Sequence, residues 1–168
     1  MAAVQFRLEQ RFAAHLRAVE DAFVDPEVLA HLAGLPGLGR PELLDRSEDG
    51  SLVRQRVRYR FEGHLSHTVT SVVDPARLTW VEESALDRRT HETEVLVLPD
   101  HYADRLRCRA TVVLAGVADG VTRVTEGDLR VRAPLLASRV ERAIVAGLHD
   151  HVAAQAAAVQ AWLDGDHR

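Results

Sequence analysis

Two polar residues near the end of the chain, His151 and Gln155, stand one helical turn apart in an alanine-rich stretch. At about 100° per residue, both fall near the centre of an apolar helix stripe that includes Leu148 and Val159. Polar side chains on a dry face need partners. Both could therefore bind a polar group of a ligand beside Leu148, and His151 could exchange a proton with it. The alternative is a core histidine and amide that neighbouring side chains or water satisfy.

A candidate carboxylate lies close to a tryptophan in the middle of the chain. If Trp80 faces a cavity, strand alternation carries Glu82 and Ser84 inward with it. A buried carboxylate can act as a general base with a raised pKa, as a cyclase or dehydratase needs. If Trp80 faces outward, Glu83 takes that position instead. The simplest interpretation of Glu82 is then a solvated glutamate near a strand end.

Four further polar residues are expected on inward faces of strands. Outward-facing glutamates at positions 92 and 94 put His91 and Thr93 inside, which makes His91 a second candidate pocket histidine. Gln10 interrupts the apolar series of the first strand. Tyr59 could offer its hydroxyl from an inner face, or it could be an amphipathic core residue at a rim. Together with Trp80, these positions are predicted to line a ligand site.

Metal and cofactor chemistry is not indicated, although the chain has nine histidines. His149 and His151 lie two residues apart, and that spacing does not place two side chains on one helix face. The sequence lacks a metalloprotease motif, paired cysteines and a glycine-rich phosphate loop. Its one cysteine, Cys108, stands among inward apolar residues and is interpreted as a buried, inert thiol. We therefore expect no metal and no cofactor.

Composition sets the class of protein. With 168 residues, 46 % of them hydrophobic, and a net charge of -4, the chain is expected to be one domain spanning residues 1–168. No stretch of the sequence comes near the about 18 consecutive apolar residues that a membrane-spanning helix needs, and no leader sequence is evident. A cytoplasmic location is therefore predicted. Arginines at alternate positions of 54–60 and of 105–109 form two rows that could suggest binding of nucleic acid. Because the total charge is acidic, and the glutamates at 92 and 94 should pair with the second row, nucleic-acid binding is not expected.

The elements that position these residues follow from hydrophobic periodicity. Two short helices are expected after the first strand, one over residues 14–23 and one restarting at Asp25-Pro26. Asp49-Gly50 predicts a hairpin, and a long amphipathic helix is expected from 134 to 163. Residues 64–73 fit a strand or a helix and loop. The seven predicted strands span residues 4–12, 40–48, 51–61, 78–85, 89–98, 105–115 and 121–132.

This order of elements resembles the helix-grip fold of the START/SRPBCC superfamily, which includes polyketide cyclases, aromatases and lipid-transfer domains. Local sequences are also similar to a branch of proteins from high-GC bacteria: VVDPARLTW at 72–80, VRAPL at 131–135 and VER at 140–142. The resemblance implies an α+β fold with a seven-stranded curved antiparallel sheet wrapped around the long C-terminal helix. It also implies a cavity between them for an apolar or amphipathic small molecule.

Three functions fit this fold, and no catalytic motif decides between them. The first is binding of a hydrophobic or amphipathic small molecule, such as a lipid or a polyketide-like compound. The alternative is a cyclase, aromatase or dehydratase, which requires at least two inward ionisable groups close together, for instance His151 with Glu82 or His91. The third is a packed, partner-binding domain without a cavity. The chain is expected to be a monomer or a homodimer.

Overall fold

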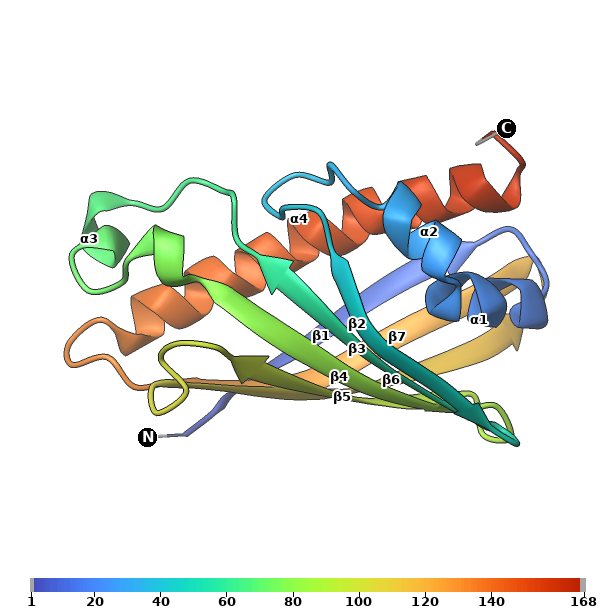
Figure 1. Cartoon of the computed structure of the whole chain (residues 1–168), viewed down its shortest axis with the longest axis horizontal. Helices are drawn as coiled ribbons and strands as arrows, with labels where there is room; N and C mark the ends of the chain where they lie inside the picture. Colours follow the sequence, from blue (N-terminus) through green and yellow to red (C-terminus); the bar gives the residue numbers. More distant parts are fainter. Residues whose placement is uncertain (1, 167–168) are drawn as a thin grey trace.

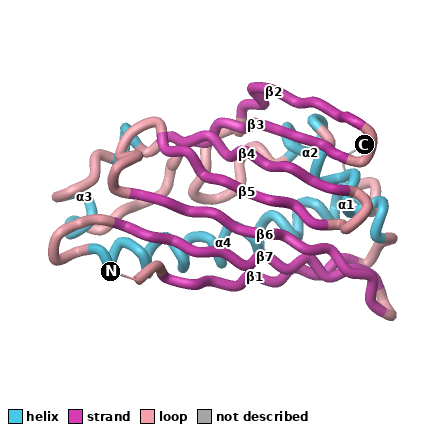
Figure 2. The backbone as a smooth tube through the Cα atoms, turned by 90° about the horizontal axis from the view of Figure 1, so that it is seen from below, coloured by secondary structure: helices cyan, strands magenta, loops and turns pink. Residues whose placement is uncertain are grey.

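A seven-stranded antiparallel sheet forms the body of the computed structural model, which describes residues 2–166 (Figure 2). Its strand order is β1-β7-β6-β5-β4-β3-β2. The strands are β1 (Val4–Phe12), β2 (Glu42–Asp49), β3 (Leu52–Arg60), β4 (Thr79–Asp87), β5 (Glu92–Pro99), β6 (Leu106–Val117) and β7 (Gly120–Val131). All seven predicted strands are confirmed, because alternating polar and apolar residues give each strand one face toward the interior.

Four α-helices accompany the sheet in the described part of the chain: α1 (Leu16–Val24), α2 (Pro26–His31), α3 (His67–Thr70) and α4 (Ala137–Leu163); a short 3-10 helix, η1 (Pro75–Arg77), precedes β4. The Asp25 carboxylate accepts a hydrogen bond from the Glu27 backbone amide at 2.8 Å, so Asp25 caps α2 as expected. The ambiguous segment 64–73 contains no strand; it is a loop with the single turn α3. Helix α4 begins at Ala137, not 134, because Leu135 adopts a left-handed backbone with φ of 62°.

The long helix α4 runs along the concave side of the curved sheet, while α1 and α2 cover one end of that side (Figure 1). Along the β1 and β7 half, apolar residues from α4 pack on the sheet around Phe6, Leu129 and Val140. At the end where the short helices lie, Val19 of α1, Val28 of α2 and Val159 of α4 meet in a second cluster. The two clusters fix α1, α2 and α4 relative to the strands that carry the candidate site.

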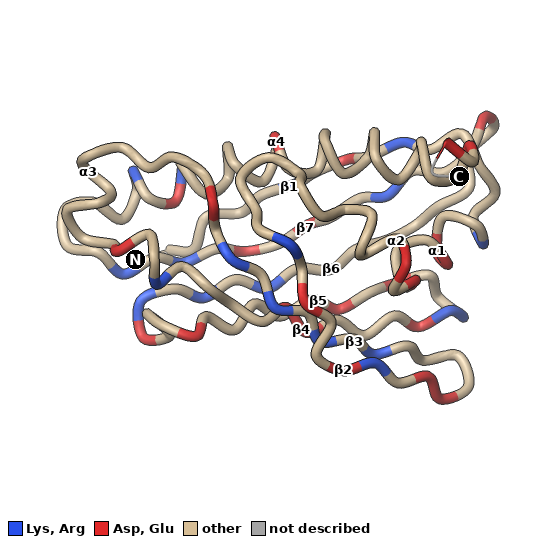
Figure 3. Tube along the Cα trace, turned by 45° about the horizontal axis from the view of Figure 1, so that its top comes forward, with Lys and Arg blue, Asp and Glu red and all other residues tan. Residues whose placement is uncertain are grey.

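The arginine rows lie on the outer face of the sheet and pair with acids on neighbouring strands. Arg56 contacts Glu83 at 3.0 Å, and Arg109 contacts Asp128 at 3.0 Å. Pairing of the arginines with acids on neighbouring strands is therefore confirmed. The predicted partners of the second row, the glutamates at positions 92 and 94, are wrong, because Arg109 pairs with Asp128 of β7. Basic and acidic residues alternate over the trace instead of separating into one-sign patches (Figure 3). No helix within residues 2–166 is long and apolar enough to cross a membrane.

Candidate functional site

An internal cavity of about 80 Å³ lies between the short helices and the concave face of the sheet. Its apolar walls come from α1, α2 and the strands β3 to β6. Eight polar or charged residues also line it: Glu20, Gln55, Tyr59, Glu82, Ser84, Thr93, Arg123 and Gln155. A cavity with apolar walls and a few convergent polar groups is typical of a small-molecule site.

Arg123 of β7 is the main positive charge at this cavity. Its Nη1 donates to Oε1 of Gln10 at 2.7 Å, and its guanidinium carbon lies 4.0 Å from the centre of the Phe23 ring. Its Nε has no hydrogen-bond partner, and no salt bridge joins Arg123 to a carboxylate among the residues that the structure describes. Burial lowers the pKa of Arg123 to about 10, while the nearby Glu82 opposes the shift. The side chain therefore remains a cation at neutral pH.

Gln10 holds Arg123 in place and ties β1 to α4. Its side chain is only 4 % exposed. The Nε2 group donates to the Val152 carbonyl at 2.8 Å and to Oε1 of Gln155 at 3.1 Å, while Oε1 accepts from Arg123. Because both ends of the amide are used, its orientation is determined. Gln10 therefore faces inward as predicted, but it supports Arg123 and does not line the cavity.

Glu82 of β4 and Tyr59 of β3 are two further ionisable residues of the cavity wall. Burial raises the pKa of Glu82, and the Arg123 charge partly opposes this. Burial also raises the pKa of Tyr59, with a further contribution from Glu82. The Tyr59 ring stacks on Trp80, with ring centres 5.9 Å apart. Glu82 and Ser84 both line the cavity, as the inward alternative predicted, whereas Trp80 on the same strand face packs on Tyr59 and does not reach it.

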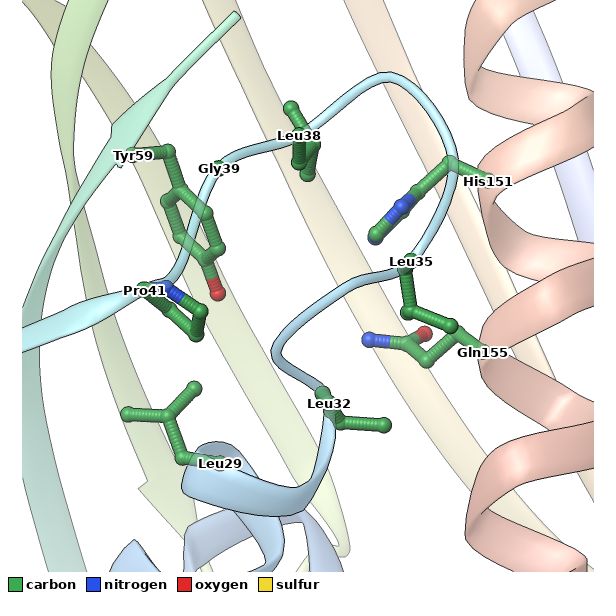
Figure 4. A pocket seen from close by; sticks show the side chains of 9 residues that line it. All are labelled: Leu29, Leu32, Leu35, Leu38, Gly39, Pro41, Tyr59, His151 and Gln155. Atoms are coloured by element: carbon green, nitrogen blue, oxygen red, sulfur yellow. The ribbon is translucent and has the colours of Figure 1, made fainter. Parts of the chain in front are cut away.

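His151 lies in a separate, smaller space of about 10 Å³ next to the main cavity (Figure 4). His151 and Gln155 project from α4 toward the loop between α2 and β2, and Tyr59 faces them from β3. The Nδ1 atom of His151 is buried without a partner in the described part of the chain. Burial, and secondarily the Arg123 charge, lower the pKa of His151, so the ring is neutral at neutral pH. A space of this size suits one water molecule.

His91 is not among the residues that line the cavity, although its side chain faces α1 on the inner side of the sheet, where it contacts Glu20. Strand β5 begins at Glu92, so His91 belongs to the preceding turn, where its φ of 60° breaks the alternation. Its Nδ1 lies 2.7 Å from Oε2 of Glu20, and Arg88 Nη1 lies 3.0 Å from the other oxygen of that carboxylate. Glu20 is 1 % exposed, so these two contacts compensate a fully buried acid.

The other predicted residues divide between cavity and core. Tyr59, Thr93 and Gln155 line the main cavity. Leu148 does not; it packs against the apolar cluster around Phe6, because the part of α4 that carries it lies over β1 and β7. His151 and Glu82 line two adjoining spaces whose walls share Leu29, Leu32, Tyr59 and Gln155.

Arg123 and Glu20 are the residues that sequence reasoning missed. Arg123 alternates in step with the buried Val121 and Leu129 of β7, so strand alternation could have predicted that it faces inward. Glu20 follows the buried Val19 and lies on the inner side of α1. Cys108 is a free thiol whose pKa burial raises to about 12. Residues 2–166 contain no group of three or more potential metal ligands.

The fold and the site together define a helix-grip protein with an internal, partly polar cavity. The sequence family described as "Protein of unknown function (DUF2505)" matches residues 7–163, and the chain belongs to this family. A search of curated protein sequences finds no match.

Solved structures share the fold at low sequence identity. TTHA0849 from Thermus thermophilus superposes with a TM-score of 0.68 at 18 % identity, covering 94 % of this chain and 98 % of that one. The Zhui aromatase/cyclase from Streptomyces sp. R1128 has a TM-score of 0.63 at 18 % sequence identity, and the match covers 99 % of this chain and 96 % of that one. Norcoclaurine synthase from Thalictrum flavum, in complex with dopamine and hydroxybenzaldehyde, has a TM-score of 0.63 at 19 % sequence identity, and the match covers 99 % of this chain and 89 % of that one. These likenesses establish the helix-grip fold that the START/SRPBCC resemblance implied.

Proposed function

We propose that this protein binds a small amphipathic molecule in the cavity between α1, α2 and the concave face of the sheet. The observation that carries the proposal is the lining of the cavity, where apolar walls enclose a buried arginine, a glutamate and a tyrosine. Burying Arg123 and Glu82 is costly unless they are paired, and neither forms a salt bridge within residues 2–166. A packed domain without a ligand would favour apolar residues at these positions.

The size of the cavity favours a small ligand. Drug-sized ligands occupy pockets of about 300–1,000 Å³, and an apolar cavity of about 150 Å³ can hold benzene. The cavity here measures about 80 Å³. A lipid or a polyketide-like compound therefore requires the loop between α2 and β2 to move.

That loop is attached unevenly, which makes such movement feasible. At its start, the backbone hydrogen bonds are long: the Ala33 amide donates to the Ala30 carbonyl at 3.2 Å, and the amides of Leu35 and Leu38 donate to Leu32 and Leu35 at 3.4 Å each. Its second half is pinned to the chain after β3, where the Gly39 amide donates to the Arg60 carbonyl at 2.9 Å and the Gly37 carbonyl accepts from the Glu62 amide at 3.0 Å. An opening would therefore involve the start of the loop, next to His151.

Methyl NMR spectroscopy tests whether the cavity takes a ligand. Titration with 1-butanol, butyramide and butyrate is expected to shift the methyl signals of Val57, Val95 and Leu114, which line the cavity. Ser84→Leu fills the cavity and should abolish these shifts. The matched control is Ser47→Leu on the exposed side of β2, which should retain them. If none of the three probes shifts these signals in the unmodified protein, the proposal is refuted.

A second candidate function is acid–base catalysis in the same cavity. The observation in its favour is Glu82, whose pKa is raised by burial beside Tyr59 and Arg123. A carboxylate with a raised pKa is a stronger base, and a guanidinium or phenol can stabilise an enolate. Two of the similar structures are those of an aromatase/cyclase and a synthase, which agrees with this candidate.

Hydrogen–deuterium exchange at C3 of 2-butanone in D₂O would reveal such a base. We expect the protein to accelerate the exchange, and Glu82→Gln to remove the acceleration. Glu83→Gln, one residue away on the outer face, should leave it intact. An exchange rate equal to that in buffer alone would refute the catalytic candidate while leaving ligand binding to its own test.

The broader assignments remain proposals of the same kind. We infer one domain, a cytoplasmic location, a monomer or homodimer, and membership of a branch from high-GC bacteria. The support is the composition and the three local sequences described above. The interspersed charges of the surface favour a small-molecule partner over nucleic acid.

A further inference from the structure

We propose that the cavity selects a short-chain carboxylate, which binds the Arg123 guanidinium while Glu82 takes up a proton. This inference rests on the proposed function and names the chemical class of its ligand. It follows from three features: an unpaired buried cation, neighbouring groups that can donate hydrogen bonds, and a small cavity.

The first feature is the charge of Arg123. Its Nη1 is bound by a neutral amide, and its Nε has no partner in the described part of the chain. The other acid at the cavity, Glu20, is already engaged by Arg88 and His91. A guanidinium presents a fork of N–H donors that matches a carboxylate. An anionic ligand would therefore supply the counter-charge that the protein itself does not place within contact of Arg123.

The second feature is the set of groups around the bound anion. Tyr59, Ser84 and Thr93 bring hydroxyls to the cavity wall, and each can donate a hydrogen bond. Glu82 is the exception, because its ionised form would repel the ligand. Protonated, the same carboxyl becomes a donor. Ligand binding should thus be linked to proton uptake by Glu82.

Four other titratable groups at or near the cavity, Arg123, Tyr59, Cys108 and His151, each keep one protonation state near neutral pH. Arg123 stays protonated, and burial raises the pKa of Tyr59 and of Cys108, which keeps both in their neutral forms. His151 faces the adjoining space from α4 and is neutral, because its pKa is lowered. Glu20 on α1 remains held by its two basic partners. Glu82 is therefore the group whose ionisation would make the affinity depend on pH.

The third feature is volume. Because an apolar cavity of about 150 Å³ holds benzene, the present cavity of about 80 Å³ suits a ligand no larger than benzene, with about six non-hydrogen atoms at most. Val57, Val95 and Leu114 provide apolar walls for a short alkyl chain. A short-chain monocarboxylate such as butyrate combines the required charge with the required size.

Calorimetric titration of butyrate and of its neutral isostere butyramide tests the inference. We expect butyrate to bind at least about tenfold more tightly, because only the anion pairs with the Arg123 charge. Arg123→Met should remove this preference while butyramide still binds. Equal or weaker binding of butyrate in the unmodified protein, with butyramide bound, would overturn the inference and leave the proposed function standing. Binding of neither would overturn the inference, and the absence of methyl shifts with 1-butanol as well would overturn the proposed function.

The linked proton gives a second readout that needs no Arg123 variant. Titrations in two buffers of different ionisation enthalpy should show that the complex takes up a proton. The dissociation constant of butyrate should also rise as the pH rises through the pKa of Glu82 in the ligand-free protein, a pKa that burial raises, and the rise should be up to about tenfold for each step of one in pH. Glu82→Gln should abolish this rise, whereas Glu83→Gln should not. Butyrate binding without proton uptake would overturn the role of Glu82.

Discussion

The hydrogen-bonded bridge through Gln10 offers the sharpest test of the structure around the cavity. Gln10→Leu removes one hydrogen bond to the charged Arg123 and two neutral ones, to Val152 and Gln155. A bond to a charged group contributes about 1.5–3 kcal/mol and each neutral bond about 0.5–1.5 kcal/mol. The free energy of unfolding should therefore fall by about 4 kcal/mol.

Pairing this change with Arg123→Met isolates the contribution of the charge. With Gln10 gone, the buried guanidinium loses the one side-chain hydrogen bond that it makes in the described part of the chain and keeps only its contact with the Phe23 ring. Replacing both groups by apolar ones removes that penalty. The double variant Gln10→Leu/Arg123→Met should therefore be more stable than Gln10→Leu alone, with a coupling energy of about 1.5–3 kcal/mol.

Urea unfolding followed by circular dichroism measures all four proteins of this cycle. Gln160→Leu serves as a control on α4, because its amide contacts the loop after β1 and the helix end and not the cavity. The reasoning is refuted if Gln10→Leu costs less than about 1 kcal/mol, or if the two changes are additive.

Three further predictions concern residues around the cavity and the sheet. Because the pKa of Glu82 is raised in the folded state, the native protein binds more protons than the unfolded chain above about pH 4.3. The free energy of unfolding, measured relative to Glu82→Gln, should therefore fall as the pH rises through the folded pKa of Glu82. The fall should be about 1.4 kcal/mol for each tenfold difference in proton affinity between the folded and unfolded states. A difference that does not change between about pH 4 and pH 8 would contradict this prediction. Arg88→Met should cost about 3 kcal/mol, since it leaves the buried Glu20 with His91 alone, and Glu20→Gln should recover part of the loss in urea unfolding. Gly127→Ala should cost about 1–3 kcal/mol, because a Cβ there would lie 2.5 Å from Cζ of Phe6; an unchanged melting temperature would argue against that packing.

Sequence periodicity predicts the frame of this protein well, because burial of one face determines each element. The alternation in β1 and the stripe on α4 both follow from the need to remove apolar side chains from water. Strand alternation also predicts correctly that Thr93 and Tyr59 line the cavity. It predicts the same for Glu82 if Trp80 is taken to face inward.

Parity fails where a strand ends or where a charge is buried. His91 lies in the turn before β5, where its backbone is left-handed, so its side chain contacts Glu20 of α1 and does not line the cavity. Arg123 has inward parity, yet an arginine on a strand is ordinarily solvated. Its burial depends on Gln10 and Phe23, which come from distant parts of the sequence. Such long-range partners are not encoded in any local pattern.

The most direct test of the cavity as a ligand site is a filtered NOE experiment with butyrate and methyl-labelled protein at about pH 6. Val95 and Leu96 are adjacent on β5 but face opposite sides, and Leu96 is 43 % exposed on the outer face. We predict NOEs from the butyrate chain to the methyl groups of Val57, Val95 and Leu114. NOEs confined to Leu96 and Leu98, or none at all, would contradict an internal ligand site.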